Sequence, residues 1–431
     1  MNTEELYSYY RNYPVISTDT RSISEGCLFF ALRGESFDGN RFAAEALQKG
    51  AAYAIIDHPD YQDGKRTILV DNVLESLQQL ALHHRRQFHG PVIGITGSNG
   101  KTTTKELIAA VLQQNYKVTY TRGNLNNHIG VPLSLLAIDD RTEIAIIEMG
   151  ANHPGEIDFL CRIAEPDYGI ITNIGKAHLE GFGSFEGVIR TKSELYNFLR
   201  AHQGKCFINT DNPLLRKQAS GLEWLSYGTG EHAQLRGQTE KGDYFVTARV
   251  LFPKGWLYLK SHLIGQYNFE NIMAAARAGM QFSVDPLQIQ QAILTYQPGN
   301  NRSQLIEKRS NKIIMDAYNA NPTSMQAALT NFRQISHSPK SLFLGDMLEL
   351  GDYSSREHQK IADMIDPQEF DQVCLIGDHF SQVATRAGNI SKLKNTEELI
   401  RLLKNRPPQE NQLILIKGSH GIHLEKMIDF I

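Results

Sequence analysis

Residues 91–106 contain the feature that most constrains the fold of this chain. They read PVIGITGSNGKTTTKE, a short apolar strand, a glycine-rich turn and the start of a helix. Gly97 and Gly100 allow several backbone N–H groups to point into one hollow at a helix N-terminus, where anions are favoured. Lys101 can reach the β- and γ-phosphates of a nucleotide, and the Thr102 hydroxyl can join a Mg²⁺ shell. The flanking strand and helix make a chance surface turn a poorer explanation than a phosphate-binding loop for a nucleoside triphosphate.

Length and composition restrict the class of protein. A chain of 431 residues is too long for one core and predicts about three domains. A net charge of −3 indicates neither a nucleic-acid partner nor an anionic membrane surface. No run of about 18 apolar residues occurs, and the start of the sequence lacks the pattern of a signal peptide, so we expect a cytoplasmic protein without membrane insertion. The cysteines show no metal-ligand spacing and are expected to be buried free thiols: Cys27, Cys161, Cys206 and Cys374.

Strand and helix patterns divide the chain into three α/β domains. We expect a mixed α/β domain over residues 1–87, a central phosphate-loop domain over 88–299 and a smaller Rossmann-like domain over 300–431. A turn-rich segment, 296–303, links the second domain to the third. The basic cluster at 83–86 can suggest a phosphate site, but a solvated helix end before a linker explains it more simply.

The central domain is expected to hold a doubly wound, mostly parallel sheet. Residues 143–147 and 168–173 are continuous apolar runs, as expected for parallel strands that are buried on both faces. Helical segments separate these strands, and such sheets bind ligands at the carboxyl ends of their strands. Residues 244–263 alternate in polarity and predict an antiparallel hairpin at the edge of the sheet.

Polar side chains follow the expected strands of the central domain. Glu148 ends a strand beside the phosphate loop, which places it to hold Mg²⁺ directly or through water. A role as a helix cap is the weaker alternative, because the helix expected near Pro154 already has Asn152. His178 lies in a glycine-rich loop at the same edge. A lone histidine is usually a structural hydrogen-bonding group, but this position favours a contact with an ion or phosphate. Lys192 lies on an expected helix, where a lysine is ordinarily a solvated charge.

Further polar segments are candidates for nucleotide or substrate contacts. Asn268 and Asn271 are three residues apart on one helix face. Residues 316–322 form a polar loop after a strand, which fits nucleoside contacts across a domain cleft or simple helix capping. Residues 345–351 and 417–421 occupy equivalent positions at the ends of expected strands. Both segments would face the central domain if the carboxyl ends of its sheet and of the C-terminal sheet face each other.

The order and the amino-acid sequences of these segments resemble those of the Mur ligase family nearly from end to end. Within it, the resemblance is to members that join D-alanyl-D-alanine to UDP-N-acetylmuramoyl-tripeptide, an ATP-dependent ligation through an acyl phosphate in cytoplasmic peptidoglycan precursor synthesis. An acidic residue is expected where His128 stands, so no direct role is assigned to that side chain. The segments that carry the resemblance are 17–21, 26–39, 96–105, 123–132, 316–322 and 344–351.

The resemblance also implies roles for individual residues, a pair of Mg²⁺ ions and a monomeric enzyme. The implied catalytic residues are Lys101, Glu148, His178 and Lys192. The implied ATP-binding residues are Gly97, Ser98, Asn99, Gly100, Lys101, Thr102, Thr103, Asn268, Asn271, Arg302 and Asp316. The implied substrate residues are Thr18, Asp19 and Arg21 in the UDP-sugar-binding domain, with Asn127, Asn319 and Lys417. The implied metal ligands are Thr102, Glu148, His178 and Lys192, the last as a carbamylated lysine.

Other functions are compatible with parts of the sequence. A related ligase can add a different amino acid, or glutamate to folate, but residues 17–21 count against a folate ligase, which would start directly with the ATP domain. A nucleotide-binding scaffold or regulator that performs no ligation is a rival from another class. The presence of Lys101, Glu148, His178 and Lys192 argues against it.

Overall fold

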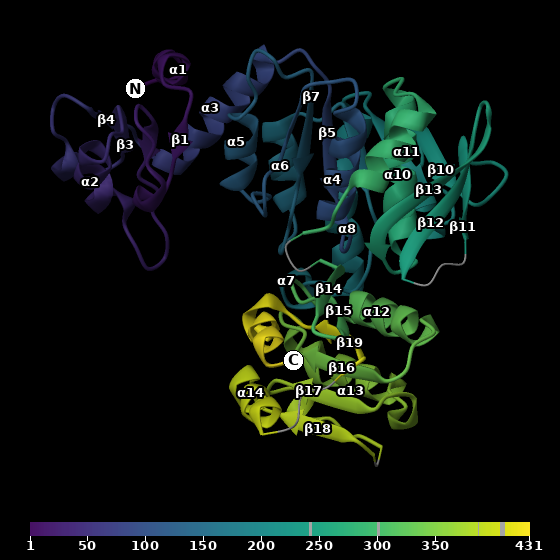
Figure 1. Ribbon diagram of the computed structural model, residues 1–431. Coiled ribbons are helices and arrows are strands. Elements are labelled where there is room, and N and C mark those ends of the chain that lie inside the picture. The colour runs from purple at the N-terminus through teal and green to yellow at the C-terminus, as the bar shows by residue number, and fades with distance from the viewer. Residues whose placement is uncertain (241–243, 300–301, 387, 406–409) are drawn as a thin grey trace.

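The computed structural model describes residues 1–240, 244–299, 302–386, 388–405 and 410–431. These residues form three α/β units, each with its own sheet (Figure 1). The N-terminal unit lies to one side of the central unit, and the C-terminal unit lies below the central unit in this view. The three-domain α/β fold expected from the sequence is confirmed. Within the described ranges, no helix is long and apolar enough to cross a membrane.

The N-terminal unit is built on a parallel sheet with the strand order β1-β2-β3-β4. The apolar run at Leu28–Phe30 forms a completely buried strand, and the helices pack around it. The strands are β1 (Ile16–Ser17), β2 (Leu28–Phe30), β3 (Tyr53–Ile56) and β4 (Thr67–Leu69). The helices are α1 (Thr3–Asn12), α2 (Ala43–Gln48) and α3 (Val73–Gln87), with short 3-10 turns at Thr20–Ser22, Gly39–Phe42 and Pro59–Tyr61.

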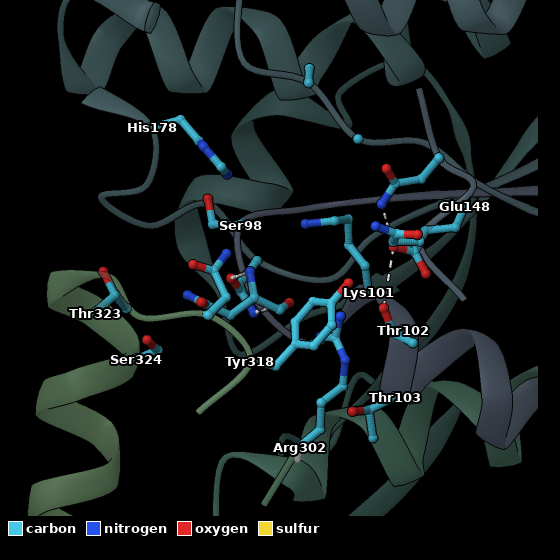
Figure 2. A pocket seen from close by; sticks show the side chains of 18 of the residues that line it. Ser98, Lys101, Thr102, Thr103, Glu148, His178, Arg302, Tyr318, Thr323 and Ser324 are labelled. Atoms are coloured by element: carbon cyan, nitrogen blue, oxygen red, sulfur yellow. Dashed lines mark hydrogen bonds between the residues drawn. The ribbon is translucent and has the colours of Figure 1, made fainter. Parts of the chain in front are cut away.

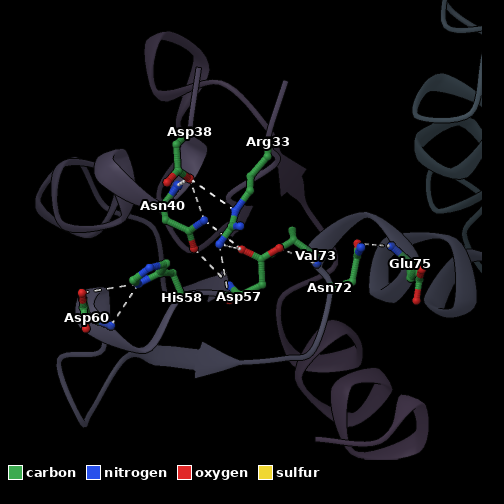
Figure 3. A network of polar contacts seen from close by, with 9 residues as sticks. All are labelled: Arg33, Asp38, Asn40, Asp57, His58, Asp60, Asn72, Val73 and Glu75. Carbon is green, nitrogen blue, oxygen red and sulfur yellow. Dashed lines mark hydrogen bonds and ion pairs between the residues drawn. The ribbon is translucent and has the colours of Figure 1, made fainter. Parts of the chain in front are cut away.

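A polar network fixes the loops at the carboxyl end of this sheet (Figure 3). The Asp57 carboxylate, just after β3, forms an ion pair with Arg33 at 2.7 Å and accepts a hydrogen bond from Asn40 Nδ2 at 2.9 Å. Its other oxygen accepts the N–H of Val73, the first residue of α3. One largely buried carboxylate thereby joins three loops of the N-terminal unit.

Within the basic cluster at the end of α3, Arg86 is exposed as expected, but Arg85 is not a solvated charge. Arg85 is buried, and its guanidinium donates to the carbonyl oxygens of Ala164 and Glu165 and to the Asp167 carboxylate. A buried guanidinium needs such partners for its donors. Arg85 therefore attaches α3 to the central unit, a role that local charge patterning does not reveal.

The central unit contains a nine-stranded sheet with the order β13-β12-β11-β10-β9-β8-β5-β7-β6. The strands from β6 to β11 pair in parallel, and β12 and β13 form the expected antiparallel hairpin at one edge. The strands are β5 (Val92–Thr96), β6 (Val118–Tyr120), β7 (Ile144–Glu148), β8 (Tyr168–Ile171), β9 (Lys205–Asn209), β10 (Glu223–Gly228), β11 (Leu235–Glu240), β12 (Phe245–Phe252) and β13 (Gly255–Ile264).

Helices cover both faces of this sheet, which is the doubly wound arrangement. The helices α4, α10 and α11 share one core with Ile93 and Ile95 of β5, whereas α5, α6 and α8 share another with Val92. The helices are α4 (Lys101–Leu112), α5 (Gly130–Leu135), α6 (Glu156–Ala164), α7 (Leu179–Phe182), α8 (Phe185–Ala201), α9 (Pro213–Gln218), α10 (Asn268–Gln281) and α11 (Pro286–Thr295). The free cysteines are all buried, as expected.

The C-terminal unit has a six-stranded sheet with the order β14-β15-β19-β16-β17-β18, parallel except for β14. The strands are β14 (Gln304–Lys308), β15 (Asn311–Asp316), β16 (Lys340–Gly345), β17 (Gln372–Ile376), β18 (Ile390–Leu393) and β19 (Leu413–Lys417). The helices are α12 (Pro322–Gln334), α13 (Ser354–Met364) and α14 (Thr396–Lys404), with a 3-10 helix at Leu424–Phe430. Residues 300 and 301 of the expected linker lie outside the described residues.

Candidate active site

A cavity of about 710 Å³ lies between the central and C-terminal units. Its walls come from the loops after β5, β7 and β8 on one side and after β15, β16 and β19 on the other. The carboxyl ends of the two sheets therefore oppose each other across the cavity, as the strand-end polar segments predicted. Figure 2 shows the side chains that converge there.

The phosphate loop forms the floor of this cavity. Gly97 has φ +142° and Gly100 φ +78°, values that L side chains rarely adopt, and a Cβ at Gly97 would meet Thr172 Oγ1. Lys101 Nζ donates to the Gly97 carbonyl oxygen at 2.8 Å, across the loop. Burial lowers the pKa of Lys101, because the charged form loses solvation. A polyphosphate would restore a counter-charge to this lysine.

The loop after β8 braces the phosphate loop. Asn99 N–H donates to Asn173 Oδ1 at 3.0 Å, and Ser98 Oγ donates to the Gly175 carbonyl oxygen at the same distance. From the C-terminal unit, Asn321 Nδ2 donates to Asn99 Oδ1 at 2.7 Å. The phosphate loop is therefore held from both units, with Thr102 and Thr103 opening α4 at the cavity wall.

Glu148 is the last residue of β7 and is almost completely buried. Its Oε1 accepts hydrogen bonds from Thr102 Oγ1 at 3.2 Å and Asn126 Nδ2 at 2.8 Å. The expected cap at Asn152 is wrong, because α6 begins at Glu156 with Gly155 as its N-cap. Glu148 caps no helix either, and its contacts direct it to the phosphate loop.

Lys105 is a functional candidate that sequence reasoning missed. Its side chain is completely buried, and Nζ lies 3.5 Å from Glu148 Oε2 and 3.9 Å from Glu106. Within the described part of the chain, this Nζ has no hydrogen-bond partner. The sequence feature that could have identified Lys105 is its position four residues after Lys101, on the same face of the helix. Lys105 and Thr102 thus contact opposite oxygens of one carboxylate.

The oxygen atoms near the phosphate loop suit Mg²⁺. Among the described residues, no three His, Cys, Asp or Glu side chains converge as a ready-made metal cage. Mg²⁺ in nucleotide sites does not require one, because it takes one or two protein oxygens together with phosphate oxygens. The adjacent Thr102 hydroxyl and Glu148 carboxylate supply such a pair.

Lys192 lies on α8, as expected, but it is not a solvated charge. Its side chain is 1% exposed, and Nζ lies 5.3 Å from the centre of the Phe182 ring. No described group forms a hydrogen bond with this Nζ. Burial, and then the charge of Lys101, lowers its pKa to about 7. A large fraction of this amine is therefore neutral near pH 7, which carbamate formation requires.

His178 connects the two units. It precedes α7 with φ +50°, and its Nδ1 lies 2.5 Å from Oε2 of Glu349, which belongs to the C-terminal unit. This contact lowers the pKa of Glu349 below the ordinary range of a carboxyl group. The structure therefore places His178 at the cavity, beside a carboxylate that sequence reasoning had left in an unassigned loop.

The expected nucleotide and substrate residues of the C-terminal unit also meet here. Lys417 Nζ donates to Asp316 Oδ2 at 2.6 Å and to the Asn319 carbonyl oxygen at 3.3 Å. The Arg302 guanidinium lies over the Tyr318 ring, 3.7 Å from its centre. Figure 2 shows Arg302 and Tyr318 close to the phosphate loop.

The paired asparagines of α10 line the cavity as well, but their amides already have partners. Asn271 Nδ2 donates to Asn268 Oδ1 at 2.8 Å, and Asn271 Oδ1 accepts from Thr104 Oγ1 at 3.0 Å. Asn268 Nδ2 donates to the Ile264 carbonyl oxygen. A Cβ at Gly100 would meet the Asn271 amide, so this pair also supports the phosphate loop.

Some expected substrate residues lie outside this cavity. Thr18, Asp19 and Arg21 belong to the N-terminal unit, where Arg21 pairs with the Asp19 carboxylate at 2.6 Å. Asn127 and His128 do line the cavity, and Asn127 Oδ1 accepts backbone N–H groups at the start of α5. The structure thus brings the residues expected to bind nucleotide together and leaves the expected substrate residues of the N-terminal unit separate.

Comparison with known proteins accounts for all three units. Residues 12–85 match the Mur ligase family catalytic domain, 95–279 the Mur ligase middle domain, and 301–420 the Mur ligase glutamate ligase domain. The UDP-N-acetylmuramoyl-tripeptide--D-alanyl-D-alanine ligase of Bacillus subtilis is 38% identical over 427 residues, which cover 96% of this chain and 92% of that protein. The chain belongs to the Mur ligase family.

Further relatives agree with the Mur ligase assignment. The Escherichia coli ligase of the same name is 33% identical over 96% of this chain and 92% of its own length. A crystal structure of MurF from Acinetobacter baumannii matches with a TM-score of 0.86 and 31% identity, covering 99% of this chain and 98% of that one. MurF ligase from Thermotoga maritima in complex with ADP matches with a TM-score of 0.84 and 27% identity, covering 96% of each chain.

Proposed function

We propose that this Mur ligase joins D-alanyl-D-alanine to UDP-N-acetylmuramoyl-tripeptide with ATP as the energy source. The single observation that carries the proposal is the cavity in which a phosphate loop, a buried Glu148 and the C-terminal strand ends meet. The end-to-end similarity to ligases of this name supports the choice of substrates, and an ADP-bound relative supports the use of ATP.

The reaction has two steps in this proposal. The carboxylate that ends the tripeptide attacks the γ-phosphorus of ATP, which releases ADP and leaves an acyl phosphate. The amine of D-alanyl-D-alanine then attacks the acyl carbon and displaces phosphate, forming the peptide bond and losing a proton. Both steps depend mainly on positioning and on neutralisation of charge on phosphoryl oxygens.

The residues of the phosphate loop perform most of this work. Its N–H groups bind phosphate oxygens, and Lys101 turns from the Gly97 carbonyl oxygen to the β- and γ-phosphates. Thr102 and Glu148 would hold a Mg²⁺ ion, which would neutralise the negative charge that develops on the phosphoryl oxygens. The remaining nucleotide contacts are assigned to the residues expected from the sequence: Ser98, Asn99, Thr103, Asn268, Asn271, Arg302 and Asp316.

Lys192 is proposed to act as a carbamate, with His178 assisting at a second Mg²⁺. A protonated lysine would repel the cation, whereas a carbamate offers two anionic oxygens of the type Mg²⁺ binds. The buried amine, free of hydrogen-bond partners among the described residues, supports this assignment. Its lowered pKa makes the neutral amine available for reaction with CO₂.

The three domains divide the substrates between them in this proposal. We assign residues 1–87 to the UDP-sugar moiety through Thr18, Asp19 and Arg21, residues 88–299 to ATP, and residues 300–431 to closure over the reacting groups. Asn127, Asn319 and Lys417 are assigned to the substrates at the cavity. Closure excludes water from the acyl phosphate.

The enzyme is proposed to work as a cytoplasmic monomer, and light scattering of the purified protein tests the oligomeric state.

A substrate panel tests the proposed function against its rivals. Phosphate release from ATP is measured with UDP-N-acetylmuramoyl-tripeptide and, in separate reactions, D-alanyl-D-alanine, single amino acids and a folate substrate with glutamate. We expect release that requires both the tripeptide nucleotide and the dipeptide. Release with a single amino acid, or with folate, would assign a different ligation, and no release with any acceptor would favour a binding protein.

A further inference from the structure

Glu349 occupies an unusual position in the wall of the cavity. It lies in the loop after β16, its side chain is 54% exposed, and its backbone has φ +63°. This left-handed conformation is uncommon outside glycine and persists where the surrounding structure enforces it. Such strain is concentrated in segments that position functional groups.

The loop that carries Glu349 is held rigidly by its own domain. Met347 N–H donates to His358 Nε2 at 3.0 Å, and Leu348 N–H donates to Ser419 Oγ at 3.0 Å. The buried Asp346 carboxylate accepts two backbone N–H groups from the segment after β17. The carboxylate of Glu349 is therefore presented to the cavity by a preorganised loop.

The other carboxylates that line the cavity are already engaged. Glu148 accepts two side-chain hydrogen bonds and faces Lys105, Glu156 accepts two backbone N–H groups, and Asp316 is paired with Lys417. Burial raises the pKa of Glu270, which favours its neutral form. Among the described residues of the cavity wall, Glu349 is an exposed carboxylate whose side chain pairs with a histidine alone, His178.

The second substrate of the proposed reaction brings a cationic group into this space. D-Alanyl-D-alanine carries an α-ammonium group before it reacts, and the nitrogen of that group must come to lie beside the acyl phosphate. The contact with His178, on the loop that braces the phosphate loop, sets Glu349 at the central domain's side of the cavity. The neighbouring Leu348 is exposed to the same cavity and offers an apolar surface to an alanyl methyl group.

We propose that Glu349 binds the α-ammonium group of the incoming dipeptide and so places its nitrogen next to the acyl carbon, which the nitrogen attacks once it has lost a proton to water. This inference rests on the proposed function, since it names the residue that receives the second substrate. His178 and the ammonium group are alternative partners of the same carboxylate, so arrival of the dipeptide releases the histidine toward the phosphoryl groups.

The variant Glu349→Gln tests the inference, because it keeps the shape of the side chain and removes the charge. We expect the KM for D-alanyl-D-alanine to rise about 10- to 100-fold, the scale of losing a hydrogen bond between charged groups. The KM values for ATP and for the UDP-tripeptide should change less than about 3-fold. Asp352→Asn, an exposed carboxylate three residues away and outside the cavity, is the matched control and should leave all three values unchanged.

A dipeptide analogue without the amine separates charge recognition from a structural effect. Propionyl-D-alanine has the shape of D-alanyl-D-alanine but no ammonium group. We expect Glu349→Gln to change the inhibition constant of propionyl-D-alanine by less than about 2-fold, while it weakens the binding of D-alanyl-D-alanine. If the variant weakened the binding of both compounds equally, the inference would be overturned, because the subsite would then be deformed rather than deprived of a charge.

If Glu349 acted only by positioning His178, the kinetic results would differ. In that case Glu349→Gln would reduce the ADP burst formed from ATP and UDP-tripeptide without dipeptide, and it would leave the KM for the dipeptide unchanged. That pattern would overturn the inference while leaving the ligase function intact. If the wild-type protein itself released no phosphate with the dipeptide, the proposed function would fail first.

Discussion

Replacing Lys105 with methionine tests the arrangement around Glu148 most stringently. Both side chains are buried, with Nζ 3.5 Å from Oε2, so Lys105→Met removes the cation of a buried ion pair and leaves the Glu148 carboxylate. Breaking such a buried pair costs about 3–5 kcal/mol. Because Oε1 keeps two hydrogen bonds, we expect the lower end, about 3 kcal/mol of unfolding free energy.

A double-mutant cycle isolates the interaction between the two side chains. Glu148→Gln removes the charge that Lys105→Met leaves unpaired, so the double variant should be less destabilised than the sum of the two single variants, by about 2 kcal/mol. Both tryptophans, Trp224 and Trp256, lie in the central domain, so their fluorescence in urea reports its unfolding. A cost below about 1 kcal/mol for Lys105→Met, or strict additivity, would refute the reasoning.

The remaining predictions concern the three substrates and the modified lysine. Lys101→Ala should lower ligation by at least about 10²–10³-fold, the scale of losing one preorganised donor, with little change in stability; near-normal turnover would exclude Lys101 from the mechanism. Asp19→Ala or Arg21→Ala should raise the KM for UDP-tripeptide and leave that for ATP nearly unchanged, and a parallel loss of ATP binding would contradict the domain assignment. Lys192→Ala should be nearly inactive and partly rescued by small carboxylates or bicarbonate, whereas Lys192→Arg should not be rescued. Electron density for an unmodified amine with Mg²⁺ and nucleotide bound would contradict the carbamate.

Local patterns predicted the parts of the fold that depend on local physics. The apolar runs of β5, β7 and β8 marked buried parallel strands, and the alternation at 244–263 marked the edge hairpin. The phosphate loop was predictable because its glycines are required by backbone conformation. Each of these features depends on residues that are consecutive in the chain, so a sequence pattern identifies it.

Tertiary contacts determined what the sequence could not show. Lys192 and Arg85 resemble ordinary helix-surface charges until distant segments bury them. Lys105 becomes significant only because β7 carries Glu148 to within 3.5 Å of it. Glu349 and His178 are far apart in the chain and meet only where two sheets face each other. Burial and pairing of charges are properties of the assembled domains.

Oxygen transfer to phosphate tests the central claim most directly. The terminal carboxylate of the tripeptide in UDP-N-acetylmuramoyl-tripeptide is labelled with ¹⁸O, and the phosphate released during ligation with D-alanyl-D-alanine and ATP is analysed by mass spectrometry. An acyl phosphate intermediate requires one carboxylate oxygen to leave with the phosphate, so we expect a single ¹⁸O in each phosphate formed. Unlabelled phosphate, with the ligated product still made, would contradict the mechanism.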